Sequence, residues 1–231
     1  MNLEYRYLPP EFVPDAVDIH IEGQPGTMLT LLGRPFLLEL YRATLYSRWA
    51  EGFGVFHNGQ LVAQAAMAAS SAHFFGEFKR RRLWRVSLPV AAAIFKAPRL
   101  LKYIGQSWRY ADLTRSPDGE CDVIFLGVKR EYMRHGIAPE LVNYMFGWAH
   151  LHGMKSANFM VDKRNRAVRW LVSHKLKGFY LAHEFEAYGR TMLFYKVPIA
   201  DNLDTAKMPA GEPVVPAYTY TEDENGNPRW I

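Results

Sequence analysis

The sequence is poor in cysteine, since Cys121 is the only one among 231 residues. A chain with a single cysteine cannot form an internal disulfide, which is typical of proteins from reducing compartments. Because no Cys/His cluster matches it, we interpret Cys121 as a buried, unreactive thiol rather than a nucleophile. The N-terminal residues also lack a basic start followed by an apolar core, so a cytoplasmic location is predicted.

Long apolar runs and several catalytic motifs are absent as well. The apolar stretch from Val86 to Phe95 is too short to span a bilayer and contains Pro89. The sequence has no Gly-x-Ser-x-Gly, no Walker loop and no Cys-x-x-Cys, so Ser/His/Asp hydrolysis is not supported. His150 and His152 lie two apart on a predicted helix and face different directions. With no other cluster at metal-ligand spacing, no metal site is predicted.

What the chain does have is the composition of one globular domain and an uneven charge. Hydrophobic residues make up 49% and aromatic residues 14% of the sequence, enough for a sizeable core. The formal net charge is +5. The segment from Pro198 to Ile231 holds six acidic and two basic residues. The segment from Lys79 to Tyr110 has no acidic residue and nine basic ones: Lys79, Arg80, Arg81, Arg82, Arg85, Lys96, Arg99, Lys102 and Arg109.

A basic centre predicts an anionic partner. Three interpretations of residues 79–109 stay open at this point. The segment could be a solvated lid, a docking face for an acidic acyl carrier protein or for cofactor phosphates, or a helix on the surface of an anionic membrane. The sequence contains no nucleic-acid reading motif, so nucleic acid is not a predicted partner.

The order of elements follows from periodicity and turn signals. Residues 3–8 and 16–23 are predicted strands, and residues 35–52 a helix that stops at Gly52. Asn58-Gly59 favours a tight hairpin within 54–68. Residues 71–113 are too long for a simple link, so two or three short helices split by Pro89 and Pro98 are predicted there. A closing hairpin over 178–199, around residues 187–190, and a loosely packed tail follow. Trp230 and Ile231 are expected to pack back onto the domain or a partner subunit.

The centre of the chain combines a strand, a loop and a helix. Val123 to Val128 reads as a strand buried on both faces. A basic connection leads into an amphipathic helix, and Gly136 and Ala138 are small residues at its start. The unpaired N–H groups of a helix N-terminus bind anions, and a residue without a Cβ allows a phosphate to approach them.

The sequence VKREYMRHGIAPEL in this region resembles the acyl-CoA-binding signature of the GCN5-related N-acetyltransferase (GNAT) superfamily. Met133 departs from it, because Arg or Gln is usual at that place, which affects one side-chain contact but not the backbone cradle. The matching residues are Val128, Glu131, Tyr132, Gly136, Ile137, Ala138 and Leu141.

A second signature follows a predicted strand at 155–162. A helical run led by Asn165 ends in HKLKGFY, which is similar to the family's Asn-led helix closing in Tyr-x-x-x-Gly-Phe. Asn165, Gly178 and Phe179 match, although the Asn-to-Gly spacing is two residues longer than usual. His174 stands where the family has Tyr.

The resemblance implies an α/β fold with a mixed, mostly antiparallel central sheet flanked by helices. One GNAT-like domain would span residues 1–198, with a basic helical insertion at 71–113 and an acidic, Pro-rich extension at 199–231. Acetyl-CoA or another acyl-CoA would be the co-substrate, with no metal. The residues implied in binding it are Phe125, Leu126, Val128, Met133, Arg134, His135, Gly136, Ile137, Ala138 and Asn165. In this scheme the loop's backbone N–H groups hold the pyrophosphate, the strand pairs with the pantetheine arm, and Asn165 binds an amide of that arm.

Amide formation from a thioester also needs a base and an acid. Asp122, at the start of the central strand, is the candidate base, acting through a water, and Glu120 is a weaker alternative. His174 is the preferred acid from its motif position, because an imidazole can donate a proton near neutral pH. Tyr180 is the reserve.

The predicted function is transfer of an acyl group from acyl-CoA to a primary amine by direct attack in a ternary complex. One alternative keeps the fold and uses a carrier protein as donor, as in the distantly similar long-chain N-acyl amino acid and acyl-homoserine lactone synthases. The other alternative is a non-catalytic acyl-CoA-binding domain. A small-molecule amine is the expected acceptor, and a homodimer and a peripheral membrane contact are further partner hypotheses.

Overall fold

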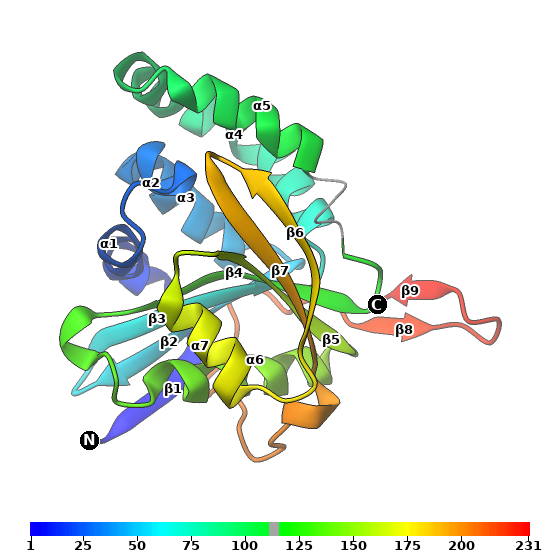
Figure 1. Cartoon of the computed structure of the whole chain (residues 1–231). Helices are drawn as coiled ribbons and strands as arrows, with labels where there is room; N and C mark the ends of the chain where they lie inside the picture. Colours follow the sequence, from blue (N-terminus) through cyan, green and yellow to red (C-terminus); the bar gives the residue numbers. More distant parts are fainter. Residues whose placement is uncertain (111–115) are drawn as a thin grey trace.

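The computed structural model describes the backbone of residues 1–110 and 116–231 and the side chains of residues 1–106 and 116–231. Seven strands form one sheet in the order β1-β2-β3-β4-β5-β7-β6, and β8 pairs with β9 in a separate hairpin (Figure 1). Neighbours in the large sheet are antiparallel except for β4 and β5. The predicted fold class, a mixed and mostly antiparallel sheet flanked by helices, is confirmed. The strands are β1 (Leu3–Tyr7), β2 (Ala50–His57), β3 (Gln60–Ala68), β4 (Glu120–Val128), β5 (Ser156–Asp162), β6 (Tyr180–Ala187), β7 (Arg190–Pro198), β8 (Tyr220–Glu222) and β9 (Pro228–Trp230).

Helices cover both faces of the sheet. One apolar cluster joins the sheet to α6 and α7, and a second joins the other face to α1, α3 and α4. The α-helices are α1 (Val13–Gly23), α2 (Met28–Leu31), α3 (Arg34–Leu45), α4 (Ser71–Lys96), α5 (Arg99–Tyr110), α6 (Ile137–Leu151) and α7 (Arg166–Lys175). Short 3-10 turns occur at Pro10–Phe12, Arg130–Tyr132 and Ala200–Asn202.

Two predictions near the N-terminus are wrong. Residues 16–23, expected to form a strand, belong to α1, whose buried residues Val13, Ala16, Val17 and His20 recur at helical spacing. The predicted helix at 35–52 ends at Leu45 instead, and Gly52 lies inside β2. A Cβ placed on Gly52 would lie 2.6 Å from Cδ2 of Leu45, so a side chain there would require Leu45 of α3 to move.

The β2–β3 hairpin is confirmed. Asn58 and Gly59 have φ angles of 51° and 75°, which are the positive values that a type I′ turn requires at both central positions. The closing hairpin of β6 and β7 is confirmed too, and it turns at Tyr188 and Gly189 with φ angles of 56° and 69°.

The inserted segment is helical, but its division differs from the prediction. Pro98 separates α4 from α5, whereas Pro89 lies inside the continuous helix α4. Proline removes one helical hydrogen bond. That loss is tolerated here because Arg85, whose carbonyl loses its partner, is exposed, so water can reach it. Residues 111–113 of the predicted insertion, and the side chain of Arg109, lie outside the described residues.

The C-terminal segment is packed against the domain, so the prediction of a loose tail is wrong. Ala217 and Tyr220 are buried in the α6-side cluster. The backbone of Ala210 exchanges hydrogen bonds with Tyr5 and Tyr7 of β1. Trp230 packs on Trp49 and Tyr220, with ring centroids 5.1 and 5.4 Å away. The expectation that this residue returns to the domain is therefore confirmed.

Candidate active site

Strands β4 and β5 separate in the middle of the sheet. They pair in parallel from Glu120 with Ser156 to Val123 with Phe159. Beyond that point neither strand pairs with the other, although β4 continues to Val128 and β5 to Asp162. The β5-facing backbone edge of residues 124–128 is therefore left without a partner strand among the described residues. An unpaired strand edge is a ready acceptor of an extended ligand through main-chain hydrogen bonds.

A β-bulge sets the direction of the side chains on β4. Phe125 pairs with Ala66 and Val123 with Met67, so Ile124 is the extra residue. As a result Ile124 and Phe125 both pack toward α1 and α3, while Val123 and Leu126 pack on the α6 side. The prediction that this strand is buried on both faces is wrong, since only Cys121 and Phe125 of β4 are fully buried.

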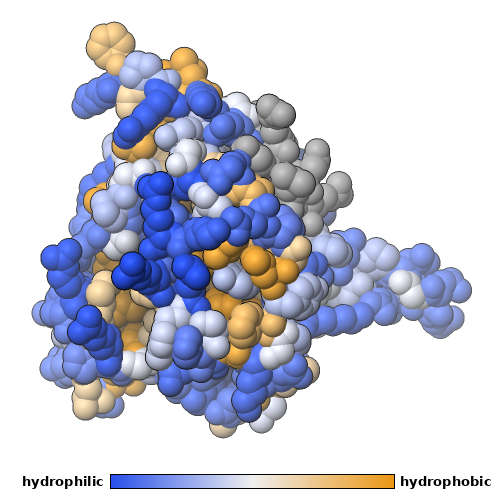
Figure 2. Space-filling view, viewed as in Figure 1, coloured by the Kyte–Doolittle hydropathy of each residue, from blue (hydrophilic) through white to orange (hydrophobic). Residues whose placement is uncertain are grey.

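Apolar residues lie in a recess of the face drawn in Figure 2, and polar residues border it.

The loop after β4 delivers the chain to the N-terminus of α6. Arg134 and Gly136 have φ angles of 66° and 77°, and Gly136 is the cap residue of the helix. A Cβ placed on Gly136 would meet no atom within 4 Å. Among the described residues, the N–H groups of Ile137 and Ala138 have no protein acceptor, as expected for the first turn of a helix.

The side chains around this cap suit an anion. Met133, Arg134 and His135 are exposed beside Gly136, whereas Ile137 is buried and anchors the helix. The helix N-terminus carries a partial positive charge, and the exposed Arg134 side chain can add a charge-assisted contact. The loop thus has the donors and the open backbone that a pyrophosphate requires.

Asn165, predicted to hold an amide of the ligand, caps α7. Its Oδ1 accepts a hydrogen bond from the N–H of Val168 at 3.1 Å. This contact explains why the helix begins there, and it leaves the amide NH₂ of Asn165 as a donor.

Asp122 belongs to a buried polar network at the place where β4 and β5 are still paired. Its Oδ1 accepts hydrogen bonds from Ser116 Oγ at 2.5 Å and from Asn158 Nδ2 at 3.3 Å. Its Oδ2 is buried without a hydrogen-bond partner among the described residues. Burial raises the pKa of Asp122, and hydrogen bonds to its carboxylate, with that from Ser116 the largest, oppose that rise. A carboxylate whose proton affinity is raised in this way is suited to general-base work.

Glu120 has a different partner. Both of its carboxylate oxygens accept from Lys196 Nζ, at 2.7 and 2.8 Å, and Asn158 Nδ2 donates to it at 3.1 Å. An ion-paired carboxylate is a poorer base than one without a cation. The geometry therefore separates the two acidic residues of β4, with Asp122 as the better base candidate.

The register places four of these side chains in one row. Asp122, Asn158, Lys196 and Tyr180 are successive Cα partners on β4, β5, β7 and β6. Sequence reasoning found Asp122 and Tyr180 but missed Ser116, Asn158 and Lys196. No local motif marks those three residues, because only the cross-strand register brings them to Asp122.

The two acid candidates lie at separate places. His174 is exposed near the end of α7, where it hydrogen-bonds Ser173 and stacks on Trp170 at 5.4 Å between ring centroids. Tyr180 is 55% exposed at the start of the edge strand β6. No contact among the described residues joins either side chain to Asp122.

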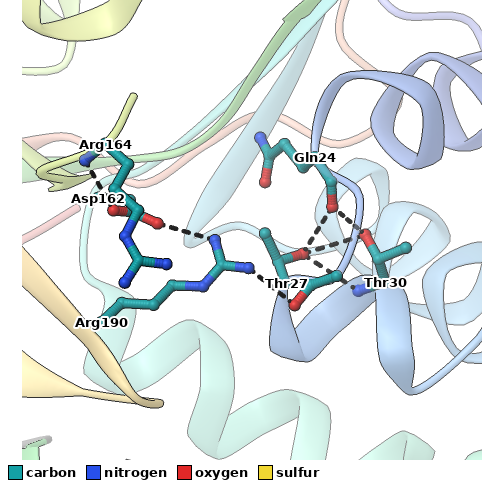
Figure 3. Close-up of polar contacts among 7 residues, drawn as sticks. Gln24, Thr27, Thr30, Asp162, Arg164 and Arg190 are labelled. Carbon is teal, nitrogen blue, oxygen red and sulfur yellow. Dashed lines mark hydrogen bonds and ion pairs between the residues drawn. The ribbon is translucent and has the colours of Figure 1, made fainter. Parts of the chain in front are cut away.

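A polar clamp ties the α1–α2 turn to the ends of β5 and β7 (Figure 3). Arg190 Nη1 donates to Asp162 Oδ2 at 2.8 Å, and its Nη2 donates to the carbonyl of Gly26 at 2.9 Å. Thr27 and Thr30 brace the same turn by donating to the carbonyl of Gln24. The clamp therefore holds the α1–α2 turn beside the end of β5, the strand that parts from β4.

Among the described residues, no cluster of three or more His, Cys, Asp or Glu side chains could hold a metal ion. No described helix is both long enough and apolar enough to cross a membrane.

Comparison with known proteins shows which solved structures have a similar architecture. No protein-family model matches the sequence. No curated protein matches it either. Solved structures do match, and the three described below are 12–14% identical to this chain. The ribosomal-protein-S18-alanine N-acetyltransferase from Escherichia coli is 14% identical, with a TM-score of 0.54 over 91% of this chain and 97% of that one.

Two further structures extend the likeness. A putative GNAT-family acetyltransferase from Desulfovibrio desulfuricans has 12% identity and a TM-score of 0.55, covering 86% of this chain and 99% of the other. A putative acetyltransferase from Salmonella typhimurium, solved with its cofactor acetyl-CoA, has 12% identity and a TM-score of 0.56, covering 86% and 95%. The chain has the GNAT fold, as its two sequence signatures predicted.

Proposed function

We propose that this protein is an N-acyltransferase that moves an acyl group from acyl-CoA to a primary amine by direct attack in a ternary complex. The observation that carries the proposal is the parting of β4 from β5 next to the Gly136-capped start of α6. An extended arm with a diphosphate at one end fits such a site. The strand edge offers main-chain hydrogen bonds to the arm, and the helix N-terminus binds the diphosphate.

The residues present fit acyl-CoA in this position. The N–H groups of Ile137 and Ala138 and the exposed Arg134 would hold the diphosphate, with Gly136 allowing close approach. The backbone of Phe125 to Val128 would pair with the pantetheine arm, and the NH₂ of Asn165 would donate to an amide of that arm. A likeness to an acetyl-CoA-bound structure of the same fold supports this choice of donor.

Asp122 is the proposed base. The attacking amine must lose its proton, and Asp122 Oδ2, which has no hydrogen-bond partner among the described residues, would receive that proton directly or through one water. The amine nitrogen then bonds to the thioester carbon, an N–H group of β4 stabilises the developing oxyanion, and the carbon–sulfur bond breaks. The departing thiolate takes up a proton, with His174 and Tyr180 as the candidate donors.

The acceptor is proposed to be a small-molecule amine. Support comes from a structural neighbour, a spermidine N-acetyltransferase chimera, with a TM-score of 0.53, 12% identity and coverage of 87% of this chain and 98% of that one. The donor class is tested by competition between short-chain acyl-CoA and long-chain acyl carrier protein.

The test is thiol release from acetyl-CoA with a panel of primary amines. We expect amine-dependent release by the native protein, and a 10²- to 10⁴-fold lower kcat for Asp122→Asn, because the amide cannot accept the proton. The matched control is Asp18→Asn, which alters an exposed carboxylate on α1 that pairs with Arg34 and should leave kcat unchanged. Unaltered kcat in Asp122→Asn would remove Asp122 from the base role. Acetyl-CoA binding without release for any amine would favour a non-catalytic acyl-CoA-binding domain.

A further inference from the structure

The outer face of α4 carries a row of large apolar side chains in contact with solvent. Trp84 is 71% exposed, Leu88 81% and Phe95 89%. At about 100° per residue these three side chains and Ala91 fall within an arc of about 60°, and they extend along about 16 Å of the helix. Val86, which is fully buried and packs α4 onto the domain, lies on the opposite side of the helix. The row is therefore not the core-facing side of the helix.

The cations around this row divide into two groups. Arg81 pairs with Glu77, and Arg82 and Arg85 reach Glu39 on α3. These pairs attach α4 to its own domain and neutralise part of the charge. A second group has no carboxylate within 4.0 Å among the described residues, and it consists of Arg80, Lys96, Arg99 and Lys102.

The two features lie together at one end of the molecule. Helices α4 and α5 project there, away from the β8–β9 hairpin (Figure 1). Apolar residues stand out from this end between polar ones (Figure 2). Leu101 of α5 adds a further apolar side chain that is 60% exposed. We propose that this outer face, made of Trp84, Leu88, Phe95 and Leu101 with Arg80, Lys96, Arg99 and Lys102, docks on an anionic lipid bilayer.

A bilayer fits these observations better than a protein. The apolar side chains project outward, and a fluid acyl layer accepts projecting side chains without the shape complementarity that a protein interface needs. The cations without a carboxylate partner are complementary to anionic headgroups, and each Lys or Arg near the membrane surface adds to the attraction. A second copy of the chain would bring the same cations face to face, and that repulsion opposes self-association through this surface.

The test is co-sedimentation of the full chain with vesicles of phosphatidylcholine containing about 30% phosphatidylglycerol, a composition with a strongly negative surface. We expect binding to these vesicles, little binding to pure phosphatidylcholine, and weakening by salt. The triple variant Trp84→Ser, Leu88→Ser and Phe95→Ser should bind at least about tenfold more weakly. The charge variant with Arg80, Lys96, Arg99 and Lys102 each changed to Gln should show a similar loss.

A control variant distinguishes binding through this surface from nonspecific adsorption to vesicles. Leu151→Ser removes an apolar side chain that is 58% exposed at the end of α6, and it should leave binding unchanged. If the triple variant does not fold, Leu88→Ser alone takes its place in the binding test, and it should still weaken binding measurably. The proposal is overturned if the native chain stays in the supernatant or if both surface variants bind as well as it does. A concentration-dependent dimer that the triple variant loses, without vesicle binding, would show that a second copy covers this face instead.

Discussion

At the scale of single residues, the two carboxylates of β4 show how neighbouring side chains distinguish similar groups. Asp122 and Glu120 lie two residues apart on β4, yet Glu120 is bound by the Lys196 ammonium, whereas no cation among the described residues pairs with Asp122. Burial raises the pKa of Asp122, so its carboxylate holds a proton more strongly than an exposed carboxylate does. The base assignment rests on this difference and not on the similar place of the two residues in the sequence.

Glu51 on β2 is a buried carboxyl group that should make the stability of the protein depend on pH. It is 2% exposed, its Oε1 accepts from the N–H of Gly52, and its Oε2 has no hydrogen-bond partner among the described residues. Burial raises its pKa to about 8, far above the value near 4.3 expected in the unfolded chain. The folded state thus keeps a proton that the unfolded state loses, so stability should fall as pH rises from about 4.5 to 8.

Glu51→Gln should remove that loss. The amide keeps the oxygen that accepts from Gly52 but cannot ionise, so the variant should exceed the native protein in stability at pH 8 by on the order of 4 kcal/mol. Near pH 4.5 the two proteins should be alike. Urea unfolding at a series of pH values measures this, with the exposed Glu4→Gln as control. Parallel pH profiles for the native protein and Glu51→Gln would show that Glu51 does not titrate as its burial implies.

At the scale of elements, helix α6 shows that the C-terminal segment is part of the domain. A Cβ at Gly147 would lie 2.2 Å from the backbone oxygen of Lys207. That oxygen belongs to the main chain and cannot rotate away like a side chain. The close approach of α6 and the segment after β7 therefore depends on glycine at this position.

Gly147→Ala should destabilise the protein by about 1–3 kcal/mol, because the added methyl group forces the two backbones apart. The matched control is Gly76→Ala in the interior of α4, where a Cβ would meet nothing within 4 Å. That substitution should raise stability by up to about 1 kcal/mol through helix propensity. Thermal and urea unfolding of both variants measures the change in stability that each substitution causes. Equal effects of the two substitutions would show that the C-terminal segment does not pack on α6.

The elements near the site were predictable where a short pattern determines them. Asn58-Gly59 predicts its turn, and the small residues at Gly136 and Ala138 predict a loop that leads into a helix. The failures have one physical cause, which is long-range packing. Residues 16–23 alternate well enough for a strand, yet the burial of Val17 and the packing of His20 on Phe125 of β4 select a helix. The row from Asp122 to Lys196 depends on register across three strands, and no local signal in the sequence encodes it.

At the scale of the whole molecule, the two faces of the sheet carry different parts of the proposed site. The α6 and α7 side brings the Gly136 cap and the Asn165 cap to the parted strands, and the opposite face carries the Asp122 row together with the clamp of Arg190 and Asp162. A donor held from one side and an amine admitted from the other would meet where β4 leaves β5. The central claim is therefore that the cap at Gly136 is the diphosphate-binding part of an acyl-CoA site.

Calorimetric titration with acetyl-CoA tests this claim most directly, with Gly136→Ala and Gly226→Ala compared with the native protein. Both glycines have a φ of 77° and no atom within 4 Å of an added Cβ, so the backbone strain of the two substitutions is matched. Gly226 lies in the β8–β9 turn, away from α6. The native protein and Gly226→Ala should bind alike, and Gly136→Ala at least about tenfold more weakly, a loss of about 1.4 kcal/mol. No binding by the native protein, or equal binding by both variants, would contradict the account.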